Sequence, residues 1–296
     1  MKMEIEELLE IASELRASVK TYISETADYG EIIAQRERDV TRRVDLFAEQ
    51  ALEQALKSRG LCARIISEEL GDRVFPSSEE GEGGGREEPE QKQEPEFTLI
   101  FDPVDGSTNA VLGIPFFCSS LAYSPKTEQI TFEDIQASVV ATFYGKTFYA
   151  VKGEGGGAFV GREGERLPRK LTGKRKRVYS FYTYGAGEET IPASLLTRFQ
   201  EVVKKNAVVR VLGSIAVEIC LVAEGVVDAV TDVRGLINGY DIAGASLILR
   251  EAGGSLTDLK GKGLEGEEVG ETRNISLVAA LEPGIHKGLL ARYDEK

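Results

Sequence analysis

The chain has 296 residues, of which 42% are hydrophobic and 29% are charged, a composition typical of a globular protein of one or two domains. Asp and Glu outnumber Lys and Arg by 49 to 36, and the formal net charge of −13 argues against a protein that binds nucleic acids through positive charge. A single histidine, His286, argues against a cluster of histidine zinc ligands and against a Ser-His-Asp triad. Carboxylates are left to perform acid–base chemistry and metal binding.

The cysteines and the N-terminal segment indicate a protein of a reducing compartment. Cys62, Cys118 and Cys220 are far apart in the sequence and form no CxxC pair, so we expect buried thiols instead of disulfides or a zinc site. Residues 1–7 are acidic where a secretory signal would be basic, and no apolar run approaches the roughly 20 residues of a membrane span. We therefore predict a cytoplasmic protein without a membrane partner.

The first part of the chain begins with two predicted helices. Apolar residues recur at helical spacing over residues 4–25, and a second helix fits residues 44–59. The apolar residues 61–66 that follow read as a strand, which ends in Ser67-Glu68-Glu69. Residues 79–96 contain eight Glu against one Arg and one Lys, a net charge of −6, and predict a solvated loop, with a docking tail for a basic partner as the alternative.

From residue 97 onwards strands succeed one another without helices, which predicts an antiparallel sheet. These strands cover residues 97–101, 116–123, 137–144 and 147–151. The basic segment 162–177 that follows predicts an exposed hairpin edge protected by charge, and the alternative is a surface for an anionic partner.

The order of elements changes after residue 177, because strands and helices then alternate as in an α/β region. The predicted strands cover residues 178–183, 207–212 and 226–231 and a segment near Ser255. The predicted helices cover residues 191–205, a segment from Ser214 onwards, and residues 241–252. We therefore divide the chain into an α+β half, residues 1–177, and an α/β half, residues 178–296.

The segment from Phe101 to Asn109 carries the clearest chemistry. An apolar strand leads into Asp102 and Asp105, and Pro103 and Gly106 favour a tight turn that brings both carboxylates and the Val104 carbonyl to one place. Such hard oxygen ligands suit Mg²⁺. The next residues, Ser107 and Thr108, are placed to begin a helix whose free N–H groups would receive a phosphate. An Asx-rich turn that caps a helix is the structural alternative, but it explains only one of the two aspartates.

The chain resembles the inositol monophosphatase superfamily in this motif, Asp102-Pro103-Val104-Asp105-Gly106-Ser107-Thr108-Asn109, and in two further segments, 67–69 and 240–254. The similarity extends over roughly residues 40–281. Within the superfamily, the sequence of residues 41–45, 98–101 and 210–214 is most similar to the archaeal fructose-1,6-bisphosphatase/inositol-1-monophosphatase type. The resemblance implies a layered αβαβα sandwich of the sugar-phosphatase type. Its sheet is antiparallel-rich in the first half and mixed in the second half.

The resemblance also assigns roles to individual residues. It implies two or three Mg²⁺ ions per site, with Mn²⁺ as a substitute, held by Glu68, Asp102, the Val104 carbonyl, Asp105 and Asp241. It implies catalytic roles in orienting the water nucleophile for Ser107, where most relatives have Thr, and for Asp45, Glu68 and Glu69. It implies substrate contacts from Asp105, Gly106, Ser107, Arg210, Gly213, Ser214, Ile215, Arg234 and Asp241. Hydrolysis by metal-activated water then proceeds without a covalent phosphoenzyme. For Asp45 a purely structural reading, a carboxylate that favours the helix dipole, remains open.

Two departures from the family pattern concern the substrate. Selective inositol monophosphatases carry a glutamate shortly before the late aspartate, and this chain has Arg234 there. Arg234 and Arg210 suit a second phosphate, which favours fructose 1,6-bisphosphate over a lone inositol ester. The second departure is Tyr240, where relatives often have Trp. In addition, residues 35–39 lack the lysine-containing form of the loop that closes over the metals.

The predicted function is therefore that of a Mg²⁺-dependent phosphomonoesterase for fructose 1,6-bisphosphate, myo-inositol 1-phosphate or both. One alternative is a nucleotide phosphatase that acts on 3′-phosphoadenosine phosphate or the 2′-phosphate of NADP. Asn109 argues against 3′-phosphoadenosine phosphate, because the relatives that act on it usually carry a different residue at this position. Another is a regulatory module that binds metal and anions without catalysis. The resemblance further implies a homodimer.

Overall fold

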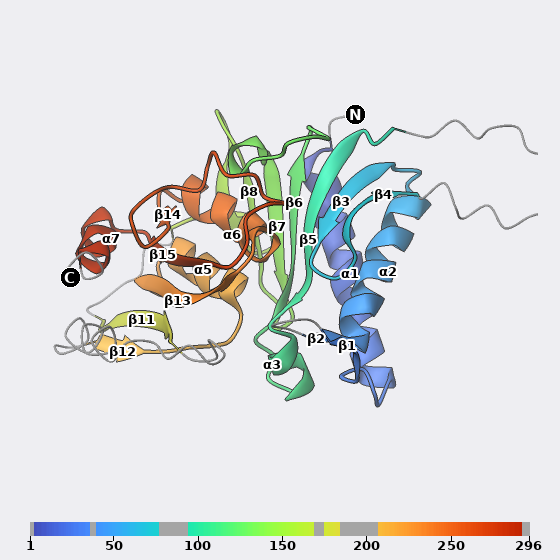
Figure 1. The fold of residues 1–296 in the computed structure, drawn as a ribbon, viewed down its shortest axis with the longest axis horizontal. Coiled ribbons are helices and arrows are strands. Elements are labelled where there is room, and N and C mark those ends of the chain that lie inside the picture. Colours follow the sequence, from blue (N-terminus) through green and yellow to red (C-terminus); the bar gives the residue numbers. More distant parts are fainter. Residues whose placement is uncertain (1–2, 36–39, 77–93, 169–174, 184–206, 292–296) are drawn as a thin grey trace, which may run out of the picture.

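The computed structural model describes residues 3–35, 40–76, 94–168, 175–183 and 207–291 (Figure 1). The predicted helix over 191–205 and most of the acidic segment 79–96 lie outside these ranges.

The described residues form five layers (Figure 1). Helices α1 (Ile5–Glu25) and α2 (Arg43–Ser58) cover one face of an eight-stranded sheet. Helices α5 (Ile215–Glu224) and α6 (Gly239–Glu251) lie between this sheet and a five-stranded sheet, and α7 (Pro283–Leu290) packs on the far face of the second sheet. This is the αβαβα sandwich that the resemblance implied.

The eight-stranded sheet is antiparallel throughout except for one parallel pair, β3 with β5, and its strand order is β10-β9-β8-β7-β6-β5-β3-β4. Its strands are β3 (Ala63–Ser67), β4 (Gly71–Phe75), β5 (Phe97–Asp105), β6 (Cys118–Ser124), β7 (Ala137–Thr142), β8 (Thr147–Val151), β9 (Gly157–Val160) and β10 (Glu165–Arg166). The exposed β10 is an edge strand, so the start of the basic segment 162–177 does form a hairpin at the sheet edge. The antiparallel-rich first half is confirmed.

The five-stranded sheet is mixed, as predicted for the second half. Its order is β12-β11-β13-β15-β14, in which β11 is parallel to both of its neighbours and β15 is antiparallel to both of its own. Its strands are β11 (Arg177–Tyr182), β12 (Ala207–Val209), β13 (Ala229–Ile237), β14 (Ser255–Thr257) and β15 (Ile275–Ala280). Three smaller elements complete the described fold: the hairpin of β1 (Ile32–Gln35) with β2 (Val40–Arg42), the short helix α3 (Ser107–Val111) and a 3₁₀ turn, η1 (Phe132–Asp134).

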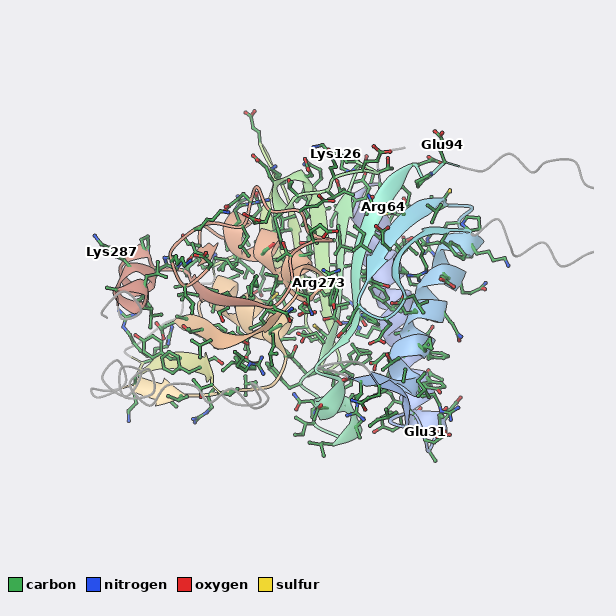
Figure 2. All side chains as sticks on the ribbon, in the orientation of Figure 1. Glu31, Arg64, Glu94, Lys126, Arg273 and Lys287 are labelled. Atoms are coloured by element: carbon green, nitrogen blue, oxygen red, sulfur yellow. The ribbon has the colours of Figure 1, made fainter. Side chains whose placement is uncertain are left out.

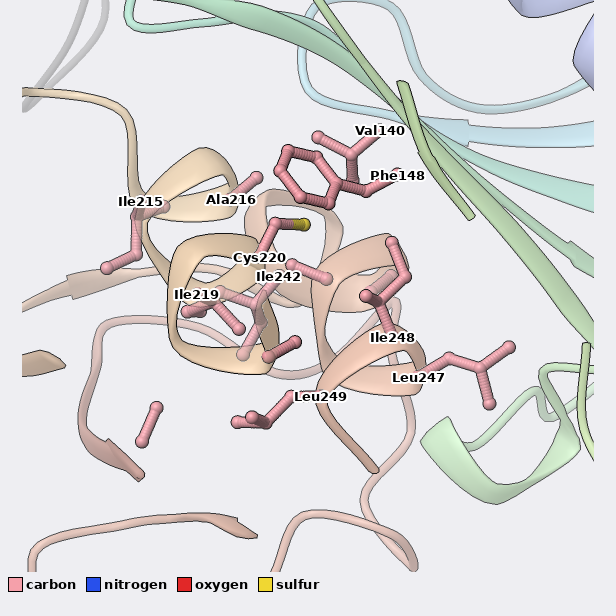
Figure 3. Close-up of a cluster of buried hydrophobic side chains, with 14 of the residues drawn as sticks. Val140, Phe148, Ile215, Ala216, Ile219, Cys220, Ile242, Leu247, Ile248 and Leu249 are labelled. Carbon is pink, nitrogen blue, oxygen red and sulfur yellow. The ribbon is translucent and has the colours of Figure 1, made fainter. Parts of the chain in front are cut away.

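The central helices α5 and α6 are buried because both sheets cover them. In Figure 3, Val140 and Phe148 of the first sheet meet Cys220 of α5 and Ile248 of α6. A β-carbon at Gly244 of α6 would lie 2.6 Å from Ser120 Oγ of β6, so only glycine permits this close approach. All three cysteines are buried and free, as expected from their spacing.

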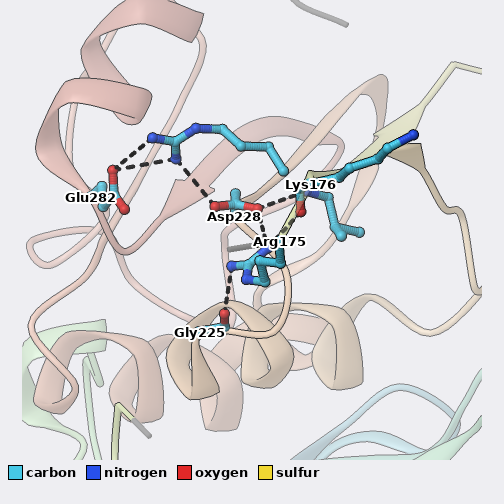
Figure 4. A network of polar contacts seen from close by, with 7 residues as sticks. Arg175, Lys176, Gly225, Asp228 and Glu282 are labelled. Atoms are coloured by element: carbon cyan, nitrogen blue, oxygen red, sulfur yellow. Dashed lines mark hydrogen bonds and ion pairs between the residues drawn. The ribbon is translucent and has the colours of Figure 1, made fainter. Parts of the chain in front are cut away.

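Charged side chains join the outer elements of the second half. Asp228 accepts hydrogen bonds from Arg175, Arg177 and the backbone N–H of Val178, and Arg177 also reaches Glu282 at the start of α7 (Figure 4). These contacts hold the beginnings of β11, β13 and α7 together. No helix of the described residues has the length and apolarity that a membrane crossing requires.

Candidate metal centre and substrate cavity

The motif of residues 102–109 forms a sharp corner at the end of β5. The ladder between β5 and β6 shifts register between Asp102 and Asp105, and Gly106 follows with a φ of 92°. A β-carbon at Gly106 would lie 3.0 Å from the Gly213 carbonyl oxygen and 3.2 Å from Phe117 Cβ. Glycine is therefore required both by the positive φ and by the close packing. The helix that begins at Ser107 is present, but it is only five residues long.

Three carboxylates from distant parts of the chain meet at this corner. Glu68 follows β3, Asp102 lies in β5, and Asp241 lies in the first turn of α6; one oxygen of each lies within 4.8 Å of the others. Asp102 is only 2% exposed, and its Oδ1 has no hydrogen-bond partner within the described part of the chain. Burial raises the pKa of Asp102 well above its usual range, and the charges of Asp105 and Asp241 raise it further.

These observations fit a divalent cation. Carboxylates that are buried together repel one another unless a cation or a proton separates them, and an all-oxygen donor set is the one that Mg²⁺ prefers. Glu68, Asp102 and Asp241 are thus the side chains best placed to hold metal. Val104, two residues after Asp102 in the motif, is buried and lies on the wall of the same cavity.

Asp45 and Asp241 reach the cavity in the same way, from the third position of a helix. Asp45 Oδ2 accepts a hydrogen bond from the N–H of Arg42 at 2.8 Å, and Asp241 Oδ2 accepts one from the N–H of Asn238 at 2.7 Å. Each contact belongs to a capping box that begins its helix, α2 or α6. Asp45 thus has a structural role at the start of α2, and it also lines the same cavity as the metal ligands, together with Ser107 and Glu69, so its catalytic role stays a prediction.

Asp105 is turned toward the second half of the molecule. Its Oδ2 accepts hydrogen bonds from Ser214 Oγ at 2.6 Å and from the N–H of Ala216 at 2.7 Å, and its Oδ1 accepts one from the N–H of Ile215 at 3.2 Å. Asp105 thus caps α5 from 110 residues away. Burial raises the pKa of Asp105 to about 6 in spite of these donors. Its role as a metal ligand remains a prediction, because the tight group of three does not include it.

The corner opens into a cavity of about 340 Å³ between the two halves. Of the residues assigned to substrate by the resemblance, it is lined by Asp105, Gly106, Ser107, Gly213, Ile215, Arg234 and Asp241. Ser214 is buried behind the wall, where its hydroxyl donates to Asp105. Arg210 is exposed outside the lining and donates to the carbonyl oxygen of Val209.

Arg234 is held on the cavity wall by two neighbours. Its Nε and Nη2 donate to Asp232 Oδ2 at 3.0 and 2.6 Å, and its guanidinium lies 4.5 Å from the centre of the Tyr182 ring. Asp232 is fully buried. The Tyr182 hydroxyl accepts a hydrogen bond from the N–H of Gly213 at 3.2 Å and is also bonded to the carboxyl group of Glu218.

Neither the sequence motifs nor the family resemblance assigned roles to Asp232, Tyr182 or Glu218. A signal existed for Asp232, because side chains two positions apart in a strand share a face, which places it beside Arg234. No comparable signal existed for Tyr182 and Glu218, which meet only through the packing of β11 against α5.

Tyr240, the other departure from the family pattern, is half-buried, and its ring lies 5.3 Å from the guanidinium of Arg273. Figure 2 places Arg273 near the middle of the molecule.

Comparison with known proteins agrees with this geometry. Residues 2–295 match the inositol monophosphatase family. The chain therefore belongs to this family, and it is a metal-dependent phosphomonoesterase.

Within the family the chain is similar to several archaeal enzymes. It is 32% identical over 273 residues to a fructose-1,6-bisphosphatase/inositol-1-monophosphatase of Methanothermobacter thermautotrophicus, covering 90% of this chain and 88% of that one. It is 26% identical to a bifunctional NADP phosphatase/NAD kinase of Methanococcus maripaludis, over 99% of this chain but 49% of that one. The crystal structure of an inositol monophosphatase–fructose 1,6-bisphosphatase superposes with a TM-score of 0.72 at 26% identity, covering 99% of this chain and all of that one.

Proposed function

We propose that this enzyme hydrolyses fructose 1,6-bisphosphate, myo-inositol 1-phosphate or both, and that it depends on Mg²⁺. The observation that carries the proposal is a single cavity with acidic residues on one wall, Glu68, Asp102 and Asp241, and Arg234 on another. The archaeal relatives whose names include both activities support the same substrates.

The chain's own residues divide the work of phosphate ester hydrolysis. When bound, two or three Mg²⁺ ions, or Mn²⁺ in their place, would supply charge neutralisation at the phosphate and activation of a water nucleophile. Glu68, Asp102, Asp241, Asp105 and the Val104 carbonyl would hold these ions.

The residues that flank the carboxylates would act on water and substrate. The Ser107 hydroxyl would orient the attacking water and a carboxylate, Asp45 or Glu69, would accept its proton, because all three residues line the cavity beside the metal-binding carboxylates. The backbone of Gly106, Gly213 and Ile215 would contact the substrate. A phosphate transferred directly to water leaves no covalent phosphoenzyme.

Arg234 is the better of the two predicted arginines for a second phosphate. It lies on the cavity wall, whereas Arg210 is exposed outside it. A guanidinium can bind a phosphate through two parallel N–H donors, which a glutamate at this position cannot do. The arginine therefore favours a bisphosphate substrate over an inositol monophosphate.

A nucleotide substrate is the second candidate. Two relatives named bifunctional NADP phosphatase/NAD kinase match 99% and 86% of this chain. The match covers 49% and 44% of their own length. The wall next to Arg234 also contains Tyr182 and Leu236, which offer an apolar surface to a base or a ribose. The 2′-phosphate of NADP is therefore included in the test below.

The test is phosphate release from fructose 1,6-bisphosphate, inositol 1-phosphate, 3′-phosphoadenosine phosphate and NADP at matched Mg²⁺, with EDTA as the control. We expect the bisphosphate to have the highest kcat/KM, EDTA to stop release, and Arg234→Glu to reduce release mainly from the bisphosphate. Arg210→Glu is the matched variant, and we expect a smaller effect from it. NADP as the only substrate, or release that resists EDTA, would contradict the proposal.

Two further expectations follow the family. We expect a homodimer, which analytical ultracentrifugation of the purified chain tests. A cytoplasmic location also stays a prediction.

A further inference from the structure

The charge of Arg234 is compensated before any substrate binds. Its Nε and Nη2 both donate to Asp232 Oδ2, and the side chain of Asp232 is fully buried while that of Arg234 is 16% exposed. The backbone N–H of Arg234 donates to the other oxygen, Asp232 Oδ1, at 2.8 Å. Arg234 and Asp232 therefore form an ion pair within β13, and the two charges compensate each other.

The orientation of the guanidinium is also fixed from the side. Its Cζ lies over the Tyr182 ring, 4.5 Å from the ring centre, and the Tyr182 hydroxyl is hydrogen-bonded to Gly213 N–H and to Glu218. Glu218 in turn accepts hydrogen bonds from Ser180 Oγ at 3.0 Å and from Leu212 N–H at 2.8 Å. The arginine is thus tied to the backbone of residues 212–213, and Gly213 itself lines the cavity.

We infer that Asp232 is a positioning residue which holds Arg234 in the orientation that receives the non-reacting phosphate of a bisphosphate substrate, and that this pair sets the preference for bisphosphates over monophosphates. The inference rests on the proposed function. Since a compensated arginine attracts distant anions only weakly, it selects by the geometry of its N–H donors and not by charge alone.

Orientation of Arg234 by Asp232 and attraction of the substrate by the charge of Arg234 alone predict opposite effects when Asp232 is replaced. Removing the charge of Asp232 leaves Arg234 uncompensated, so attraction by charge would improve binding of a bisphosphate. If orientation dominates, the same change weakens it. Arg234→Lys separates the two in a second way, because lysine keeps the positive charge but has no planar pair of donors.

The experiment measures kcat/KM for fructose 1,6-bisphosphate and for inositol 1-phosphate in the wild type and in Asp232→Asn. We expect the ratio of the two to fall about 10-fold, mostly through a higher KM for the bisphosphate. Arg234→Lys should lower the ratio as much as Arg234→Gln does. Thr231→Val is the matched control, because Thr231 is the preceding buried residue of β13 and its hydroxyl has no hydrogen-bond partner in the described part of the chain.

The double variant Asp232→Asn/Arg234→Gln guards against a folding defect, because it removes both charges together. We expect it to have the same ratio as Arg234→Gln alone, since Asp232 acts through Arg234. An unchanged or higher ratio in Asp232→Asn, or an equal loss with both substrates, would overturn the inference and leave the proposed function intact. A wild type that releases no phosphate from either sugar phosphate would instead remove the proposed function, and this inference with it.

Discussion

The two walls of the cavity handle charge in opposite ways. On the acidic wall, Asp102 is buried beside other carboxylates, and its Oδ1 has no hydrogen-bond partner among the described residues. On the arginine wall, the buried Asp232 is paired with Arg234 at 2.6 Å.

What differs is the partner. Among the described residues that line the cavity, the acidic wall has no cationic side chain, whereas the arginine wall contains Arg234.

This difference between the two walls indicates which part of the site depends on a ligand for its stability. Like charges that are buried together lower the stability of the fold until a cation binds, so metal binding and folding are coupled at the acidic wall. The arginine wall is complete without a ligand. We therefore expect changes at the acidic wall to respond to Mg²⁺, and changes at the arginine wall to respond to the substrate.

The largest expected effect comes from Asp102→Asn, which removes one of the repelling charges. We expect phosphate release to fall by more than ~100-fold, because a metal ligand is lost. The melting temperature of the protein in EDTA should rise, because a buried charge is removed from the cluster. Phosphate release and thermal unfolding on the same preparation measure both, and a normal rate together with a lower melting temperature in EDTA would contradict the account.

A second effect concerns pH in the absence of metal. The pKa of Asp105 is raised from 3.8 to about 6 in the fold, so the folded protein keeps a proton that the unfolded chain releases. Its contribution to stability is complete below pH 4 and is lost as the pH rises through 6, by about 1 kcal/mol per pH unit at most for one proton.

Unfolding by urea between pH 4 and 7 in EDTA measures this slope. Saturating Mg²⁺ should flatten or reverse it, because metal ions compete with protons for carboxylates. Asp105→Asn is the control that should weaken the slope. A stability in EDTA that rises steadily from pH 4 to 7, with no difference between the wild type and the variant, would speak against a carboxyl group with a raised pKa at this position.

Glu218 offers a smaller effect behind the arginine wall. Burial raises its pKa to about 7, so it too contributes stability at low pH that is lost as the pH rises through 7. Glu218→Gln keeps an acceptor for Leu212 N–H and Ser180 Oγ but removes the charge. We expect the variant to be more stable than the wild type by about 1–2 kcal/mol at pH 8 and no more stable at pH 4.5. Addition of Mg²⁺ should leave this difference in place, and a benefit that is independent of pH would refute the explanation.

The smallest effect is expected from the acidic segment. Replacing residues 79–92 by a short Gly-Ser linker should leave kcat/KM for the preferred substrate within about 2-fold, because its composition provides almost no apolar surface to bury. Steady-state kinetics of the shortened chain test this. Loss of all activity in a folded variant would show that the segment takes part in the chemistry.

The sequence predicted most of what is encoded locally. The motif from Asp102 to Asn109 contains its own strand end, its turn glycine and its acidic side chains, so its position at the end of β5 followed directly. The capping role of Asp45 is equally local. The two long helices α1 and α2 were predicted because each carries one apolar stripe.

Contacts between distant segments were predicted only where the family resemblance supplied them, as for Glu68, Asp102 and Asp241. Asp105 caps α5 through three hydrogen bonds that span at least 109 residues, and no local pattern contains that information. The hairpin of β1 and β2 was missed because all four residues of β1 are exposed, which leaves no alternation of buried and exposed positions. Strand β13 runs on to Ile237, beyond the predicted end at residue 231, because residues 233–236 are half-buried and lack an apolar run.

We infer that Glu68, Asp102 and Asp241 form one site that a divalent cation completes. Calorimetric titration of Mg²⁺ into the metal-free wild type and into Asp241→Asn, in the presence of inorganic phosphate, tests it most directly. The account predicts saturable binding by the wild type that weakens at least ~10-fold in the variant. Equal Mg²⁺ affinity in the two proteins would contradict it.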